Sequence, residues 1–223
     1  MLKLIVFDFD GTLVDTFEDC VDAFNQALTD NGFPARDPKD YRHVFGQALP
    51  VIMKEVLPED HRDPETVEKV CQRYKEVYAA SEKARSLPYP GIRGMLDILS
   101  RLNVKLAIQS NKDQKLLDDI TGKLFGDNVF DAVQGFSETR APKPDPAGLY
   151  ELMDQFGATK EQTVYVGDGM NDIMTAHNAG IPIIAVVWGQ GRTADILDPS
   201  VEYLAPTRRA LKKIIYKLMD FNV

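Results

Sequence analysis

The chain has 223 residues, which suits one large domain or one domain with an insertion, and its 44% hydrophobic content can fill a core. Its net charge of −8 argues against non-specific nucleic-acid binding, and no apolar run approaches the ~20 residues that span a bilayer. Cys20 and Cys71 lie far apart in sequence, which excludes a C-x-x-C or zinc site and favours reduced, partly buried thiols. The first apolar run follows Met1 almost directly and leaves no room for a signal peptide, so we expect a cytoplasmic protein.

The first part of the chain predicts one strand followed by a block of helices. The apolar residues 3–8 predict a buried strand that ends in a polar, tight turn. Residues 16–90 contain no convincing strand, and their apolar residues recur at helical spacing after Thr16, the expected N-cap. Helices are predicted from residue 17 and near 48–57 and 64–84.

Strands and helices alternate after residue 90. Several strands are rich in Val and Ile without alternation, as expected when helices cover both faces of a sheet. The pattern predicts an α/β fold, with a Rossmann-like, doubly wound parallel sheet and about 75 inserted helical residues. We expect a core domain of residues 1–15 and 89–223 and a helical domain of 16–88. The predicted strands are 104–109, 129–134, 162–167 and 181–187, and the predicted helices are 93–101, 113–124, 146–156, 171–179 and 207–220.

Two aspartates, Asp8 and Asp10, follow the first strand, before Gly11 and Thr12. Carboxylates at the end of a buried strand are costly unless something pairs with them. Strand ends of open parallel sheets are also where ligands bind. Alone, this string is equally consistent with a turn whose aspartates cap a helix.

The string D-x-D-G-T-L-x-D-T from Asp8 to Thr16 resembles the first motif of the haloacid dehalogenase superfamily of phosphotransferases. Ser110-Asn111, at the end of an apolar run, resembles the second motif, and Lys143 before Pro144 the third. Residues 167–172 (G-D-G-M-N-D) resemble the fourth. The resemblance spans residues 3 to 190 and is strongest to the phosphoglycolate phosphatase branch. It implies that residues 16–88 form a helical cap over the site.

The resemblance implies specific roles for the motif residues. Asp8 is the expected nucleophile, forming an aspartyl-phosphate. Asp10 is the expected general acid and base, which requires a pKa above that of a free aspartate. Lys143 is expected to stabilise the phosphoryl charge and to orient Asp8. The expected phosphate-binding residues are Gly11, Thr12, Ser110, Asn111 and Lys143.

A divalent cation follows from the charge balance. Asp8, Asp10, Asp168 and Asp172 are expected to converge, and Lys143 alone cannot neutralise them together with a phosphate dianion. Mg²⁺ prefers carboxylate and phosphate oxygens and can do so. By resemblance, Asp8, Asp168 and the Asp10 backbone carbonyl bind the ion directly, and Asp172 binds it directly or through water.

These features predict a cytoplasmic, Mg²⁺-dependent phosphomonoesterase that acts on a small phosphorylated metabolite, phosphoglycolate-like or a sugar phosphate. Two alternatives remain: a phosphomutase of a sugar phosphate, and a non-catalytic phosphate- or partner-binding protein. We expect no nucleic-acid or membrane partner, and a monomer, with a dimer possible. Arg42 and Gln47 are the cap residues expected to face substrate, whereas Trp188 is expected to pack.

Overall fold

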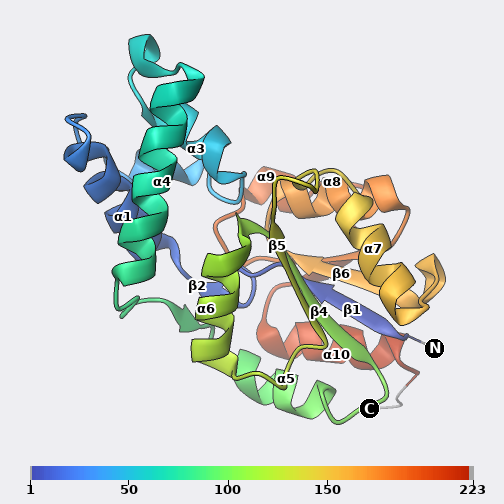
Figure 1. The fold of residues 1–223 in the computed structure, drawn as a ribbon. Helices are drawn as coiled ribbons and strands as arrows, with labels where there is room; N and C mark the ends of the chain where they lie inside the picture. The colour runs from blue at the N-terminus through green and yellow to red at the C-terminus, as the bar shows by residue number, and fades with distance from the viewer. Residues whose placement is uncertain (1, 221–223) are drawn as a thin grey trace.

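Strand β1 (Leu4–Phe7) lies inside a six-stranded parallel sheet in the computed structural model, which describes residues 2–220 (Figure 1). The strand order is β5-β4-β1-β6-β7-β8, and every neighbouring pair is parallel. The predicted doubly wound α/β fold is confirmed. The other strands of the sheet are β4 (Lys105–Asp113), β5 (Ala132–Phe136), β6 (Thr163–Gly167), β7 (Ile183–Val186) and β8 (Tyr203–Ala205).

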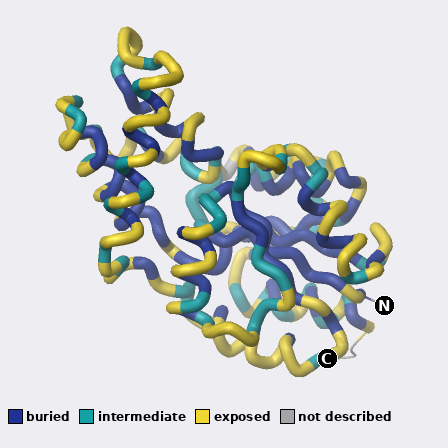
Figure 2. The backbone as a smooth tube through the Cα atoms, in the orientation of Figure 1, coloured by how far each residue is buried: buried dark blue, intermediate teal, exposed yellow. Residues whose placement is uncertain are grey.

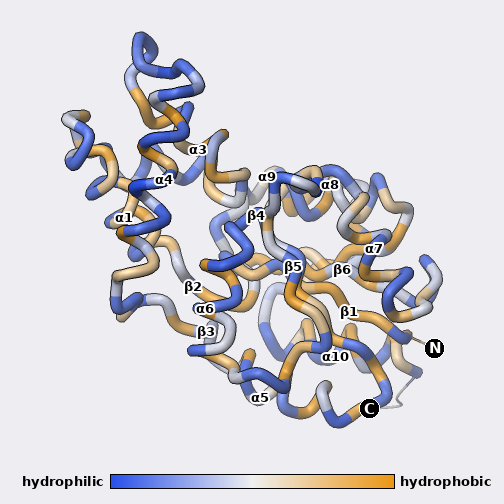
Figure 3. Tube along the Cα trace, viewed as in Figure 1, coloured by the Kyte–Doolittle hydropathy of each residue, from blue (hydrophilic) through white to orange (hydrophobic). Residues whose placement is uncertain are grey.

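Helices cover both faces of this sheet, which explains why β1 is apolar throughout. Leu4 and Val6 pack into the cluster on one face, and Ile5 and Phe7 into the cluster on the other, and all four are fully buried. Burial of a side chain of this size stabilises the fold by about 1.5–3 kcal/mol. Figures 2 and 3 show the buried, hydrophobic strands between exposed helices. The first face is covered by α7 (Ala147–Phe156) and α8 (Met170–Ala179), and the second by α5 (Ile92–Leu99), α6 (Gln114–Phe125) and α10 (Arg208–Leu218).

A block of helices lies to one side of the sheet, at the upper left of Figure 1. Phe24 anchors it, because its ring stacks on Tyr41 at 5.3 Å and on Tyr74 at 4.2 Å between centroids. None of the helices described is long and apolar enough to cross a bilayer. The block contains α1 (Phe17–Asp30), α2 (Pro38–Arg42), α3 (Leu49–Val56), the 3₁₀ turn η1 (Glu59–His61) and α4 (Pro64–Ala80).

Two short strands join this helical block to the sheet. Strand β2 (Val14–Asp15) pairs antiparallel with β3 (Leu87–Pro88), so the chain leaves the sheet domain and returns to it at one place. The expectation that residues 16–90 contain no strand is therefore wrong at β3. A strand of two residues carries no periodic hydrophobic signal, and Pro88 disfavours the assignment further.

Strand β4 extends beyond its predicted end at residue 109 and places Ser110 and Asn111 inside the strand rather than after it. The ladder to β5 continues across a register shift to Asp113, opposite Phe136. Strand β5 itself begins three residues later than predicted, at Ala132. Strand β8 at the sheet edge, the helices α2 and α9 (Thr193–Ile196), and the 3₁₀ turns η1 and η2 (Lys160–Gln162) were not predicted.

Candidate active site

Three buried carboxylates meet at the carboxyl edge of the sheet. Asp8 follows β1 and Asp168 follows the adjacent strand β6, while Asp172 lies in the first turn of α8. One oxygen of each lies within 4.8 Å of the others, and each residue is at most 5% exposed. The oxygens thus form an all-oxygen donor set of the kind that hard cations prefer.

Lys143 sits between two of these carboxylates. Its Nζ donates to Asp8 Oδ1 and to Asp172 Oδ1, both at 2.6 Å. The side chain of Asn111 fixes the lysine's backbone, accepting from its N–H at 2.8 Å and donating to its carbonyl at 3.2 Å. Lys143 precedes a cis peptide bond to Pro144. Asn111 therefore positions Lys143. The sequence predicted only that Asn111 binds phosphate, so this contact was not expected.

The cluster is short of positive charge. Among residues 2–220, Lys143 is the only cation recorded in an ion pair with these three carboxylates. Burial and the neighbouring Asp172 raise the pKa of Asp8 well above its usual value, although Lys143 opposes the shift. Burial and Asp172 also raise the pKa of Asp168 to about 7. A divalent cation would relieve this excess of negative charge.

A glycine-rich loop after β7 holds Asp168. The backbone N–H groups of Gln190 and Gly191 donate to Asp168 Oδ2 at 2.7 and 3.1 Å, and the Thr12 hydroxyl donates to its Oδ1 at 3.0 Å. Sequence reasoning missed this contribution; two glycines flanking Gln190 just after a strand were the available signal. Trp188 at the start of the loop donates from its indole to the carbonyl of Thr12 at 3.1 Å.

The turn after β1 leaves no space beside Gly11. A Cβ atom there would lie 2.5 Å from Asp168 Oδ2, and the residue has a φ of +87°. Its N–H donates to the carbonyl of Val14 at 2.9 Å, so this expected phosphate donor is already engaged in the structure. Ser110, another expected phosphate ligand, accepts from the N–H of Lys112 at 3.2 Å.

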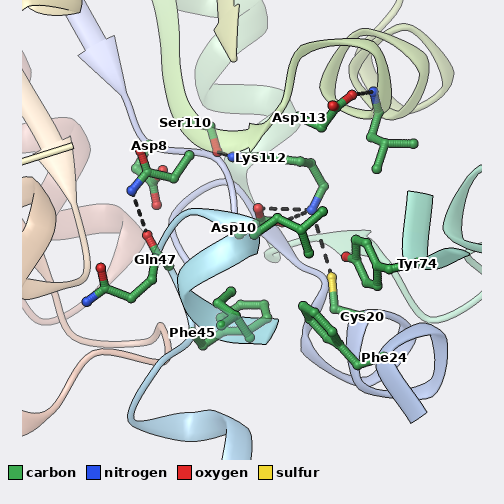
Figure 4. Close-up of a pocket in the computed structure, with 15 residues that line it drawn as sticks. Asp8, Asp10, Cys20, Phe24, Phe45, Gln47, Tyr74, Ser110, Lys112 and Asp113 are labelled. Carbon is green, nitrogen blue, oxygen red and sulfur yellow. Dashed lines mark hydrogen bonds and ion pairs between the residues drawn. The ribbon is translucent and has the colours of Figure 1, made fainter. Parts of the chain in front are cut away.

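The carboxylate of Asp10 does not join the cluster, which corrects the expectation that all four aspartates converge. Lys112 Nζ donates to both of its oxygens, at 2.9 and 3.0 Å (Figure 4). The Thr16 hydroxyl donates to Oδ1 at 2.5 Å. Thr16 is the residue before α1, but its hydroxyl makes no cap bond. These two donors turn Asp10 away from the other carboxylates and towards the helical block.

Lys112 is the main functional residue that sequence reasoning missed. Its side chain is 5% exposed, although lysine is seldom buried without a partner. Its position directly after Ser110-Asn111, the residues that resemble the second motif, could have indicated a role in the site.

The helical block contacts the sheet domain directly over the site. The carbonyl of Gly46 accepts from the side-chain amides of Asn111 at 3.0 Å and Asn171 at 3.1 Å. Arg42 donates to the Gln190 side chain at 3.0 Å. Beneath this contact lies a cavity of about 380 Å³, lined by Asp8, Asp10, Lys143, Asp168 and Asp172 and by Arg42 and Gln47 from the helical block.

Comparison with known proteins agrees with this geometry. Residues 5–186 match the family of haloacid dehalogenase-like hydrolases. The phosphoglycolate phosphatase of Agrobacterium fabrum is 32% identical over 225 residues, covering 96% of this chain and 94% of that protein. That of Haemophilus influenzae is 29% identical, covering 91% and 93%. The structure of a predicted phosphoglycolate phosphatase from Haemophilus somnus has a TM-score of 0.86 at 25% identity, covering 96% and 98%.

The chain belongs to the haloacid dehalogenase-like hydrolases, and the resemblance found in its four motifs is confirmed. It is an enzyme of the phosphatase type, as expected from the motifs.

Proposed function

We propose that this enzyme is a Mg²⁺-dependent phosphomonoesterase that hydrolyses a small phosphorylated metabolite through an aspartyl-phosphate on Asp8. The observation that carries the proposal is the cluster of three buried carboxylates with one lysine, together with a fourth, differently oriented carboxylate, Asp10, two residues after Asp8. One group is thus placed to attack phosphorus and another to exchange a proton with the leaving group.

The donor set fits a magnesium ion. Asp8, Asp168 and the backbone carbonyl of Asp10 would hold it, with Asp172 as a direct or water-mediated ligand. When bound, the ion would neutralise the carboxylates and the phosphate and polarise a phosphoryl oxygen. Thr12 and the N–H groups of Gln190 and Gly191 orient Asp168 for this task.

The chain's own residues account for both chemical steps. First, Asp10 takes up a proton from solvent; an oxygen of Asp8 then bonds to phosphorus while the ester P–O bond breaks, and the departing oxygen takes that proton from Asp10. Second, a water oxygen bonds to phosphorus, its proton passes to Asp10, and the bond from Asp8 to phosphorus breaks. Lys143 neutralises Asp8 and the transferred group in both steps. Ser110, Asn111, Gly11 and Thr12 are proposed to contact the phosphoryl oxygens.

Phosphoglycolate is the first substrate to test, because relatives covering most of the chain are phosphoglycolate phosphatases. Residues 16–88 are proposed to form the cap that selects the leaving group, with Arg42 and Gln47 lining the cavity. A panel of phosphorylated metabolites with Mg²⁺, assayed for inorganic phosphate, tests the proposal, and Asp8→Asn provides the inactive control. Conversion of one sugar phosphate isomer into another without phosphate release would instead identify a phosphomutase.

The substitution Asp10→Asn tests the acid–base assignment. It keeps the backbone carbonyl but removes the proton carrier, so hydrolysis of an alkyl phosphate should slow by about 10²–10⁴-fold. An activated aryl phosphate needs no protonation to leave, so its first step should be far less affected. Rapid-mixing assays should show a burst of aryl alcohol, followed by slow turnover limited by the second step. Equal slowing of both substrates without a burst would contradict the assignment.

A further inference from the structure

The ammonium group of Lys112 is buried at the contact between the helical block and the sheet domain. Besides the two oxygens of Asp10, Nζ has Cys20 Sγ at 3.8 Å and the ring of Tyr78 at 4.8 Å from its centroid. Among residues 2–220, Asp10 is the only carboxylate recorded in an ion pair with it. The charge of Lys112 therefore depends on one anionic partner.

A second, smaller cavity adjoins this pair. It has a volume of about 40 Å³, room for about three water-sized groups. Asp8 and Asp10 line it as they line the larger cavity, so both spaces meet at the reacting carboxylates. Its other walls are mostly apolar, with Lys112 as the cationic side chain. Phe24 and Phe45 are seen there in Figure 4, and Ile52 and Leu116 also line the cavity.

The ion pair conflicts with the proposed work of Asp10. To protonate the departing ester oxygen, Asp10 must leave Lys112 and take up a proton from solvent, and an unpaired ammonium in an apolar, buried site is costly. A neutral leaving group leaves that cost uncompensated. A leaving group with its own carboxylate can occupy the place of Asp10 at Nζ and remove the cost.

We propose that Lys112 is a specificity-determining residue that binds a carboxylate on the leaving group and thereby releases Asp10 for catalysis. The inference rests on the proposed phosphatase function. The small cavity beside Asp10 fits a short leaving group whose carboxylate lies close to the ester oxygen, as in a phosphorylated 2-hydroxy acid. The exchange at Lys112 then couples recognition to turnover, so it affects kcat as well as KM.

The test compares two substrates of equal length, 2-phosphoglycolate and 2-hydroxyethyl phosphate, which carries a hydroxymethyl group in place of the carboxylate. The wild-type enzyme should prefer 2-phosphoglycolate by about 10²-fold or more in kcat/KM. Lys112→Met should lose most of this preference, through a lower kcat/KM for 2-phosphoglycolate, and Lys112→Arg should retain part of it. The control Lys115→Met removes an exposed lysine that pairs with Asp119 and should leave the preference intact.

Two outcomes would overturn the inference. Comparable kcat/KM values for both substrates in the wild-type enzyme would do so, even if Lys112→Met fails to fold. An equal loss of kcat/KM on both substrates in a folded Lys112→Met enzyme would show that Lys112 supports the structure and does not select the substrate. Failure of the proposed function looks different: no phosphate is then released from any ester, including p-nitrophenyl phosphate.

Discussion

Asp8 and Asp10 are two positions apart, and each has its own buried lysine. Lys143 pairs with Asp8 and Lys112 with Asp10, at distances of 2.6 and 2.9 Å. The two carboxylates consequently differ in surroundings although they share one turn. Asp8 belongs to a crowded anionic cluster, whereas Asp10 belongs to a local ion pair. Separate environments of this kind are how two like groups acquire different chemical roles.

Gly11, which lies between Asp10 and Thr12, allows a prediction about the effect of one added Cβ atom. In Gly11→Ala the added Cβ meets Asp168 at 2.5 Å, so Asp168 must move and activity should fall by at least about 10²-fold. Gly32→Ala is the matched control, because Gly32 has a similar φ of +80° but nothing within 4 Å of its Cβ. It should cost about 1–2 kcal/mol of stability and leave kcat unchanged. Equal activity losses in the two variants would show that backbone strain, not the displaced carboxylate, matters.

At the scale of elements, the long apolar segments could be predicted and the short or polar ones could not. Strands β1 and β6 were predicted within a residue or two because their burial on both faces leaves an unbroken apolar run. Strand β4 was predicted to end at its first polar residues, yet its ladder to β5 continues past them. Hydrogen bonding between strands, which the sequence does not display, overrode the hydrophobic pattern.

We expect the hydrogen bonds to the Gly46 carbonyl to hold the helical block over the site. Asn171→Ala removes one of two donors to the Gly46 carbonyl and leaves that of Asn111. The loss of a hydrogen bond worth about 0.5–1.5 kcal/mol should favour separation of the block from the sheet domain. We expect faster amide exchange in residues 45–47 and a kcat/KM reduced by up to about 10-fold.

Asn178→Ala is the control for this experiment, because Asn178 also lies on α8 but donates to the carbonyl of Pro144 instead. It should leave exchange in residues 45–47 unchanged. If Asn171→Ala also leaves that exchange unchanged, the Asn171 bond does not hold the block.

Over the whole molecule, the four motifs could be assigned from the sequence by their resemblance to a family pattern, and the strands β4 and β6, which carry the second motif and precede the fourth, lie on either side of β1. The direction of the Asp10 side chain could not be predicted. It depends on hydrogen bonds from Lys112, which lies 102 residues away on β4, and from Thr16, and the sequence does not show these side-chain contacts. The role of the loop at Gln190 was missed because two glycines after a strand mark a turn but do not show that its backbone N–H groups donate to Asp168.

The charge of the site makes the stability of the whole protein depend on pH and metal. The pKa values of Asp8 and Asp168 are raised on folding, so the folded state holds their protons longer than the unfolded chain. The contribution of Asp168 to stability is complete below about pH 4 and is lost as the pH rises through its raised pKa of about 7, and the raised pKa of Asp8 acts in the same direction. We therefore expect that removing the metal with a chelator lowers the free energy of unfolding more near pH 8 than at lower pH.

Thermal unfolding measures this effect. At pH 8, Mg²⁺ should raise the Tm of the chelator-treated protein by at least about 2–4 °C, corresponding to about 1 kcal/mol, and by less at pH 5.5. Asp168→Asn removes one repelling charge, so without metal its Tm relative to wild type should improve as the pH rises. A Mg²⁺ effect independent of pH would place the ion elsewhere.

The pairing of strands β2 and β3 brings the two ends of the helical block together, which bears on whether the block can be replaced. Because Val14 pairs with Pro88 and Asp15 with Leu87, the helical block is attached at two points separated by about the 5 Å between neighbouring strands. An insertion with adjacent ends can be exchanged without moving the strands that carry Asp8 and Asp168. We therefore expect that the block can be exchanged as one unit. If it is the cap proposed above, replacing residues 17–86 with those of a relative should change the choice of leaving group while Thr16 still contacts Asp10 and Lys112 keeps its place on β4.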